Sequence, residues 1–169
     1  VSGHYSIEEI RVKRFEKRLI TIIRHPVYRL LSDYNYKRNG YKKRNAIKKL
    51  YHGGRIMAAG KYSFEGYIDF LKEHEIPTGR VATHYILGDK EIKNKKDFMQ
   101  ENYFAFGTVE KLAKFTEDLE SKTGRRTEVV HKNVTHNKHL PELSHKERQA
   151  AERFCHEDME LYAAVDSLV

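Results

Sequence analysis

The hydrophobic pattern of the chain first changes from strand-like to helix-like near residue 24. Residues 18–24 form a β-branched run that predicts a buried parallel strand, and the following His25-Pro26 is a turn signal. Proline favours the first turn of a helix, and apolar residues recur at helical spacing over 27–34. We therefore expect a strand, a tight turn and a helix in this order.

The same order of patterns returns in the second half of the chain. Residues 103–109 predict a second strand, and an amphipathic helix through Leu112, Phe115 and Leu119 is expected to end near Gly124. Strands that alternate with helices are typical of α/β folds. The sequence therefore predicts an α/β fold with a parallel sheet flanked by helices.

The remaining segments of the chain predict shorter helices and loops, apart from one long helix near the C-terminal end. We find no internal repeat and no linker rich in Pro, Gly or Ser, so we expect a single domain over residues 1–169. The other expected elements are a short helix over 6–17, a loop over 53–60, a helix that starts at the N-cap Ser63, a β-like piece over 127–130, a polar loop over 132–143, and a long helix over 144–165 that begins with a Ser144–Glu147 capping box.

Composition narrows the class of protein. Of the 169 residues, 39% are hydrophobic and 33% charged, which is typical of globular chains and excludes fibrous ones. The longest apolar run, 19–23, is far shorter than the roughly 20 residues of a membrane span, so we expect no transmembrane segment in this chain. The single Cys155 excludes an internal disulfide and a cysteine-based zinc cluster. It favours the cytoplasm, and the Golgi lumen stays open if an anchor precedes the chain.

The formal net charge of +8 is concentrated in the first third of the chain. Residues 1–60 hold 15 Lys and Arg against 4 Asp and Glu, whereas residues 61–169 hold 17 against 20. Such asymmetry raises the local concentration of anionic ligands. Nucleic acid, an anionic glycan, a phosphorylated nucleotide and a lipid headgroup all fit this charge.

The segment after the first predicted strand is a candidate anion site. In open α/β sheets, ligands bind where a strand ends and the next helix starts. Arg24 lies at this edge, and Ser32 follows two helical turns later, so a guanidinium and a hydroxyl could hold one phosphate. The alternative is that Arg24 and Arg29 only solvate the sheet edge, while Ser32 fills a helix face.

The stretch Arg24-x-Pro26-x-x-Arg29-x-x-Ser32-x-Tyr34 resembles a known motif. It is similar to the 3′-phosphate-binding segment of sulfotransferases that use 3′-phosphoadenosine 5′-phosphosulfate (PAPS), particularly the family of heparan sulfate and carbohydrate O-sulfotransferases. Further similar segments follow the family's order and cover nearly the whole chain: Ser2-Gly3-His4-Tyr5, Ser63-Phe64-Glu65-x-Tyr67-x-x-Phe70, 106–112 with its Gly-x-x-Glu turn, 131–135, and Asp158-Met159-Glu160-Leu161-Tyr162.

The resemblance implies an enzyme that transfers a sulfuryl group from PAPS to a hydroxyl, with 3′-phosphoadenosine 5′-phosphate (PAP) as the product and no metal. The expected acceptor is a hydroxyl of a carbohydrate or another small molecule. The resemblance assigns Arg24 and Ser32 to the nucleotide. The polar loop carrying Asn133, Thr135 and Lys138 is expected to close over the same nucleotide, since such loops can cover a bound anion.

The resemblance also places His4 near the acceptor hydroxyl, as the candidate catalytic base. A histidine has an ordinary pKa of about 6.5 and can take the hydroxyl proton near neutral pH. The alternative is a histidine near the N-terminus with no catalytic role.

One part of the family's pattern is missing. The family's enzymes carry, ahead of the region matched here, a strand and a phosphate-cradling loop of the Lys-x-Gly-Thr/Ser type. Gly54-x5-Gly60-Lys61 only superficially resembles a Walker loop, because the glycine spacing, the residue after the lysine and the preceding strand all differ. Either the chain is a C-terminal fragment of a longer enzyme, or it is a degenerate member of the family that cannot hold the sulfonate donor well. We expect the fragment, with a P-loop-kinase-like sulfotransferase fold that lacks its N-terminal phosphosulfate-loop strand.

The basic run over 37–49 is a candidate acceptor surface. Arg38, Lys42, Lys43 and Arg44 lie just beyond the predicted cofactor helix, where they could steer an acidic acceptor such as a uronic-acid glycan. The alternative is a solvated helix face.

The rival function is a non-catalytic basic module that binds nucleic acid or sulfated glycan, because tyrosines interleaved with cations also suit bases. No nucleic-acid-binding motif is present, so we do not expect nucleic acid as a partner. Three clustered histidines, His131, His136 and His139, lack the helical spacing of a zinc site, so we expect no metal.

Overall fold

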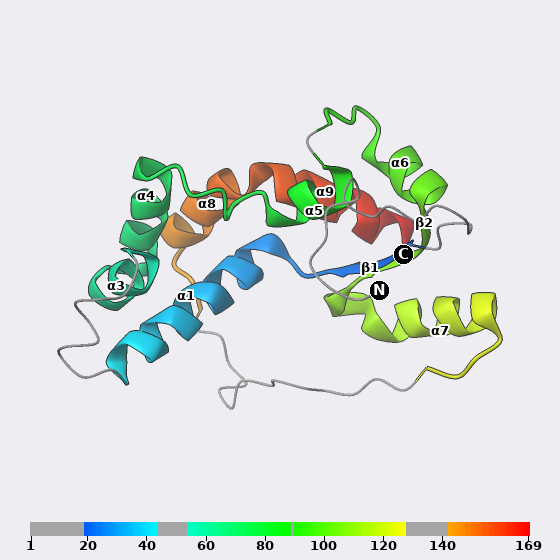
Figure 1. The fold of residues 1–169 in the computed structure, drawn as a ribbon, viewed down its shortest axis with the longest axis horizontal. Helices are drawn as coiled ribbons and strands as arrows, with labels where there is room; N and C mark the ends of the chain where they lie inside the picture. Colours follow the sequence, from blue (N-terminus) through cyan, green and yellow to red (C-terminus); the bar gives the residue numbers. More distant parts are fainter. Residues whose placement is uncertain (1–18, 44–53, 89, 128–141) are drawn as a thin grey trace. The chain divides into compact units, whose positions relative to one another are not determined.

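The computed structural model describes residues 19–43, 54–88, 90–127 and 142–169 (Figure 1). The described residues are mostly helical and include a two-stranded parallel sheet, so the predicted α/β class with a helix-flanked parallel sheet is confirmed. The chain divides into two compact units, each described by itself below. Unit 1 comprises Val1–His25, Arg80–His136 and Glu157–Val169, and unit 2 comprises Pro26–Gly79 and Asn137–His156. The single-domain expectation stays a prediction.

Unit 1 is built around the parallel strands β1 (Leu19–Ile23) and β2 (Tyr103–Thr108), which the sequence pattern predicted within one or two residues. The turn after β2 leads directly into a helix that ends at Gly124, where a φ of 65° suits glycine. The elements of this unit are β1 (Leu19–Ile23), α5 (Val81–Leu87), α6 (Lys95–Asn102), β2 (Tyr103–Thr108), the 3₁₀ turn η1 (Val109–Lys111), α7 (Leu112–Thr123) and α9 (His156–Leu168).

The two faces of the β1–β2 pair are covered differently (Figure 1). On one face, α7 packs against Gly107, where an added Cβ would lie 2.8 Å from Cβ of Phe115. Parallel pairing sets Ile22 beside Gly107 on this face. Within the described residues, however, the helix on this face packs on β2, so Ile20 is 50% and Ile22 39% exposed. The prediction of a buried first strand is therefore wrong for these two residues.

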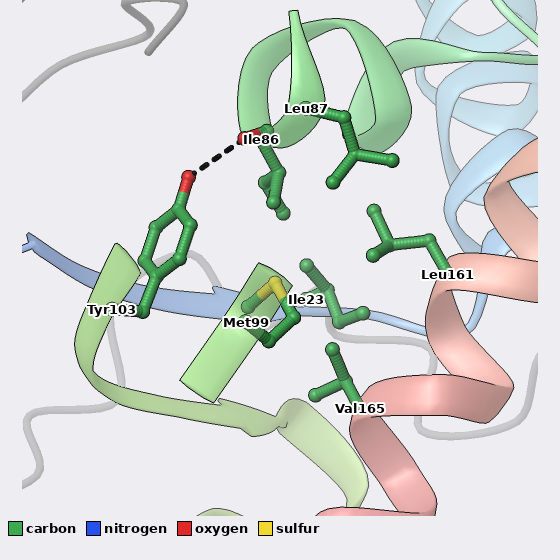
Figure 2. Packing of buried hydrophobic residues seen from close by; sticks show 7 residues of the cluster. All are labelled: Ile23, Ile86, Leu87, Met99, Tyr103, Leu161 and Val165. Carbon is green, nitrogen blue, oxygen red and sulfur yellow. Dashed lines mark hydrogen bonds between the residues drawn. The ribbon is translucent and has the colours of Figure 1, made fainter. Parts of the chain in front are cut away.

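The other face of the strands forms the core of unit 1. Figure 2 shows Ile23 surrounded by side chains from α5, α6, α9 and β2. The hydroxyl of Tyr103 donates to the main-chain oxygen of Ile86 at 3.0 Å, which satisfies its polar atom inside the apolar cluster. The cluster consists of Ile23, Ile86, Leu87, Met99, Tyr103, Leu161 and Val165.

Unit 2 consists, in its described part, of four helices: α1 (Pro26–Lys42), α3 (Gly54–Lys61), α4 (Phe64–Glu73) and α8 (His145–Phe154). Helix α1 begins at Pro26 and buries the predicted apolar side, including Tyr34. The carboxylate of Asp33 on this helix joins three elements, because it accepts from Arg55 of α3 and Tyr67 of α4 and also pairs with Lys37.

The loop expected over 53–60 is wrong, since residues from Gly54 onward form helix α3. Ala58 and Ala59 are buried, and Gly60 lies so close to Tyr41 that an added Cβ would be 2.2 Å from its ring. Packing of small residues therefore outweighs the low helix propensity of glycine. A helical backbone also leaves no phosphate-cradling loop over 54–61.

Two predicted caps are confirmed, but the final helix is divided. Ser63 accepts from the main-chain N–H of Gly66 at 3.2 Å, and Ser144 and Glu147 form the expected capping box. The prediction of one long helix is wrong, because α8 ends before Cys155 and α9 starts after it. The two halves bury their apolar sides in different units: Ala151 belongs to unit 2 and Leu161 to unit 1.

The predicted elements over 6–17, 127–130 and 132–143 lie wholly or largely outside the described residues. None of the helices in the described part of the chain combines the length and apolar character needed to span a bilayer.

Candidate functional site

The carboxyl ends of β1 and β2 bring together residues that are distant in the sequence. Because the strands are parallel, the segment after Ile23 and the segment after Thr108 emerge at the same edge of the sheet. His25 follows β1, and Glu110 lies in the turn after β2. Together with Tyr162 of α9 they form the carboxyl-edge cluster, defined here as His25, Glu110 and Tyr162.

Glu110 holds this cluster together. Its Oε1 accepts from the main-chain N–H of His25 at 3.1 Å, and its Oε2 accepts from the hydroxyl of Tyr162 at 3.2 Å. The rings of His25 and Tyr162 meet edge to face, with their centroids 5.0 Å apart. One carboxylate therefore ties the turn after β1 to helix α9.

The tyrosine of the cluster stays a hydrogen-bond donor. Burial, followed by the negative charges of Glu110 and Asp166, raises the pKa of Tyr162 to about 12. A neutral hydroxyl is the form that can donate to a carboxylate, and the raised pKa of Tyr162 favours this form.

The end of β2 is fixed to α9 by a second set of contacts. The fully buried Thr108 donates to Oδ1 of Asp166 at 3.4 Å. The ammonium group of Lys111 lies 3.0 Å from Oδ1 of Asp166 and donates to its main-chain oxygen at 2.8 Å. Together with the contact of Glu110 with His25, these contacts fix the backbone at the carboxyl ends of both strands.

In the sequence, Arg24 lies between the last residue of β1 and His25 of the carboxyl-edge cluster. Its side chain is partly exposed and makes no hydrogen bond or ion pair with the residues that the structure describes. The Ser32 hydroxyl on α1 likewise has no partner among these residues. Arg24 belongs to unit 1 and Ser32 to unit 2, so a phosphate site shared by the two stays a prediction.

No family model, curated protein or solved structure matches this chain. The likeness to sulfotransferases therefore rests on the sequence motifs, and the specific fold of that family stays a prediction. Three of those motifs are brought together in unit 1: the segment after the first strand, the Gly-x-x-Glu turn and the Asp-x-x-Leu-Tyr helix contribute His25, Glu110 and Tyr162.

The predicted acceptor residues on and just after α1 differ in their surroundings. Nη1 of Arg38 donates to the hydroxyl of Tyr34 at 3.1 Å, and the guanidinium lies 5.6 Å from the centre of that ring. Lys42 and Lys43 are exposed, and their ammonium groups have no ion-pair partner among the described residues. Arg38 is thus engaged within unit 2, whereas the two lysines are available to a ligand.

Several predicted site residues cannot be placed by the structure. The candidate base, one basic residue, the nucleotide loop and the clustered histidines all lie outside the described residues: His4, Arg44, Asn133, Thr135, Lys138, His131, His136 and His139. Within the described ranges, no group of three or more His, Cys, Asp or Glu side chains is arranged to hold a metal ion. The absence of a metal stays a prediction.

The sequence motifs named Glu110, Asp158 and Tyr162 without giving them roles. The buried carboxylate of Asp158 accepts the main-chain N–H groups of Ala82 and Thr83, at 3.1 and 2.8 Å, and so holds the start of α5. An acidic residue directly after a predicted strand was the available signal for Glu110. No local signal indicates that Tyr162 reaches it.

Glu110→Ala is expected to destabilise unit 1 by about 1 kcal/mol, because two hydrogen bonds to a carboxylate are lost at a partly solvated site. Amide hydrogen exchange of His25 should become faster in the variant. The matched control is Glu117→Ala on the exposed side of α7, which should change neither quantity. Unchanged protection of the His25 amide would show that Glu110 does not hold the turn.

Proposed function

We propose that this protein is a sulfotransferase that transfers a sulfuryl group from PAPS to a hydroxyl, most simply one on a carbohydrate. The observation that supports the proposal is the carboxyl-edge cluster. Three segments that resemble sulfotransferase motifs contact one another at the sheet edge where α/β proteins bind ligands. Arg24 precedes His25 of this cluster in the sequence, and it has no partner among the described residues.

Arg24 at this edge fits a nucleotide phosphate, because a guanidinium without a partner among the described residues can form a two-point clamp on the 3′-phosphate of PAPS. The hydroxyl of Ser32, which belongs to the other unit, is proposed on the resemblance alone to add a neutral hydrogen bond. The loop with Asn133, Thr135 and Lys138 is proposed to cover the nucleotide. When the reaction is complete, these groups hold the 3′-phosphate of the product PAP.

The transfer itself needs a base and positioned charges. The acceptor oxygen forms a bond to sulfur as the bond between sulfur and the phosphate oxygen of PAP breaks, and the hydroxyl proton passes to the base, for which we propose His4. Cations near the transferred group offset its negative charge. No metal is required for this step.

The test of the nucleotide site is titration of the chain with PAP by calorimetry. Arg24→Ala should weaken binding by roughly ten- to a hundredfold, because a charge-assisted clamp contributes about 1.5–3 kcal/mol. Ser32→Ala should have a smaller effect. The matched control is Arg125→Ala in the same unit, an exposed arginine that follows α7, and it should bind PAP like the unmodified chain. Equal affinity of the Arg24→Ala variant and the control would contradict the assignment.

The same titration separates the enzyme from the rival basic module. An enzyme site built for PAPS should prefer a 3′-phosphorylated nucleotide to the 2′-phosphorylated or unphosphorylated analogue. A diffuse basic patch should discriminate little among the three, and its affinity should fall steeply with salt.

A further inference from the structure

The turn after β2 is held against helix α9 at two consecutive residues. The carboxylate of Glu110 accepts from the hydroxyl of Tyr162 at 3.2 Å, and the ammonium group of Lys111 lies 3.0 Å from Oδ1 of Asp166. Tyr162 and Asp166 are four residues apart on α9, so their side chains lie on the same face of this helix. This face of α9 therefore fixes the position of Glu110.

The other carboxylate oxygen of Glu110 reaches the segment after the neighbouring strand. It accepts from the main-chain N–H of His25 at 3.1 Å. This N–H belongs to the planar peptide group that also contains the carbonyl of Arg24. Because β1 ends at Ile23 and the Glu110 contact follows at His25, the backbone is fixed on both sides of Arg24. The direction in which the Arg24 side chain leaves the backbone is thereby restricted.

The side chain of Arg24 is not held by a contact of its own in the described part of the chain. It is partly exposed and makes no hydrogen bond or ion pair with a described residue. A long side chain in this state samples many rotamers, and a ligand that binds it has to order it. A fixed backbone limits this sampling and leaves the N–H donors of the guanidinium available.

We propose that Glu110 is a positioning residue for Arg24, itself held in place by Tyr162, in the nucleotide site of the function proposed above and thus dependent on it. Glu110 does not touch the nucleotide. It directs the guanidinium of Arg24 through the amide of His25, and so reduces the entropy lost when Arg24 clamps a 3′-phosphate. Helix α9 thereby affects a ligand contact made from the segment after β1.

A carboxylate near a phosphate site can also act through its charge, with the opposite effect on binding. The negative charge of Glu110 repels a phosphate, so its removal would tighten binding if repulsion were its main effect. Glu110→Gln separates the two effects, because the carboxamide oxygen can still accept from the His25 N–H but carries no charge. Positioning predicts that the Gln variant keeps most of the affinity and the Ala variant loses it, whereas repulsion predicts that both bind more tightly.

The test is calorimetric titration of the whole chain with PAP and with adenosine 5′-phosphate, which lacks the 3′-phosphate. Glu110→Ala should weaken PAP binding about three- to tenfold, the range that corresponds to ordering one long side chain, and should leave the affinity for adenosine 5′-phosphate nearly unchanged. Tyr162→Phe should weaken PAP binding about twofold, since Glu110 keeps its bond to His25. The matched control is Tyr103→Phe, which removes a tyrosine hydroxyl bond in the core of the same unit and should change neither affinity (Figure 2).

A double-mutant cycle makes this result specific to Arg24. In the Arg24→Ala background, Glu110→Ala should change PAP affinity by less than about 1.5-fold, because the side chain that Glu110 positions is absent. A merely structural role would weaken the binding of both nucleotides alike and would persist in this background. Either of these results, or tighter PAP binding by the Glu110→Gln variant, would overturn the proposal.

A measurement without nucleotide separates the positioning from the proposed enzyme. The order parameter of the Arg24 Nε–H group, from ¹⁵N relaxation, should fall in Glu110→Ala and stay unchanged in Glu117→Ala. If it falls but the unmodified chain binds no PAP, Glu110 still positions Arg24 and the sulfotransferase proposal fails. If PAP binding depends on Arg24 but neither the order parameter nor the affinity responds to Glu110→Ala, the positioning fails and the sulfotransferase proposal stands.

Discussion

Replacing Asp158 with alanine is expected to lower the free energy of unfolding by about 2–4 kcal/mol. The carboxylate is fully buried, and it accepts the N–H groups of Ala82 and Thr83 at the start of α5. Its removal leaves two main-chain donors without acceptors and takes a negative charge away from the positive end of the helix. Urea denaturation followed by circular dichroism measures the change.

Two companion variants make this result specific. Asp158→Asn keeps one acceptor oxygen, so it should cost clearly less than alanine. Asp69→Ala removes a carboxylate that is 67% exposed and pairs with Lys72 at 3.6 Å, so it should cost less than about 0.5 kcal/mol. If Asp158→Ala were as mild as Asp69→Ala, the buried carboxylate would not stabilise α5.

Replacing His4 with alanine is expected to lower sulfuryl transfer by this protein about 10²- to 10⁴-fold, the range of lost general-base catalysis. An alcohol is a weak nucleophile until its proton is being removed. PAP affinity should stay nearly unchanged, because the proton acceptor serves the sugar hydroxyl and not the nucleotide. Steady-state turnover and PAP titration on the same protein measure the two effects.

The control for this variant is His145→Ala, which removes an exposed histidine at the start of α8. It should leave turnover within about twofold, since a surface substitution away from the site changes little. Turnover of the His4→Ala variant equal to that of the control, or collapse of PAP binding together with turnover, would show that His4 is not the base.

Elements with strong local signals could be predicted from the sequence. The run ending at His25-Pro26 marked both the end of β1 and the start of α1, and Gly124 marked the end of α7. Ser63 and Ser144 marked two helix starts through caps that lie within four residues of the groups they bind. In each case the stabilising contact is local, so its pattern is visible in the sequence.

Elements fixed by distant contacts could not be predicted. Helix α5 is only seven residues long and has no side-chain cap of its own; the carboxylate that holds its start is 75 residues away. Helix α3 contains two glycines and depends on packing of its small residues. Helix α6 was missed although its local cap, Asn94, was available as a signal.

The candidate site divides in the same way. The sequence singled out Arg24 because a cation directly follows a predicted strand, and it did not give Glu110 and Tyr162 a role because their contact joins positions 52 residues apart. The run of basic residues on and just after α1 was visible, but only the structure showed that Arg38 is engaged by Tyr34.

The pairing of β1 with β2 also has a consequence for how unit 1 folds. Glu110 and His25, which follow the two strands, are 85 positions apart, so the strands meet only after a long segment of chain has been brought back. Closing so large a loop costs conformational entropy before the stabilising contacts between the strands form, and this slows folding. Until then β1, in which Ile20 and Ile22 stay partly exposed in the described structure, is an unpaired apolar strand able to pair with another molecule. Refolding of this protein is therefore expected to compete with self-association, and dilute conditions favour the folded chain.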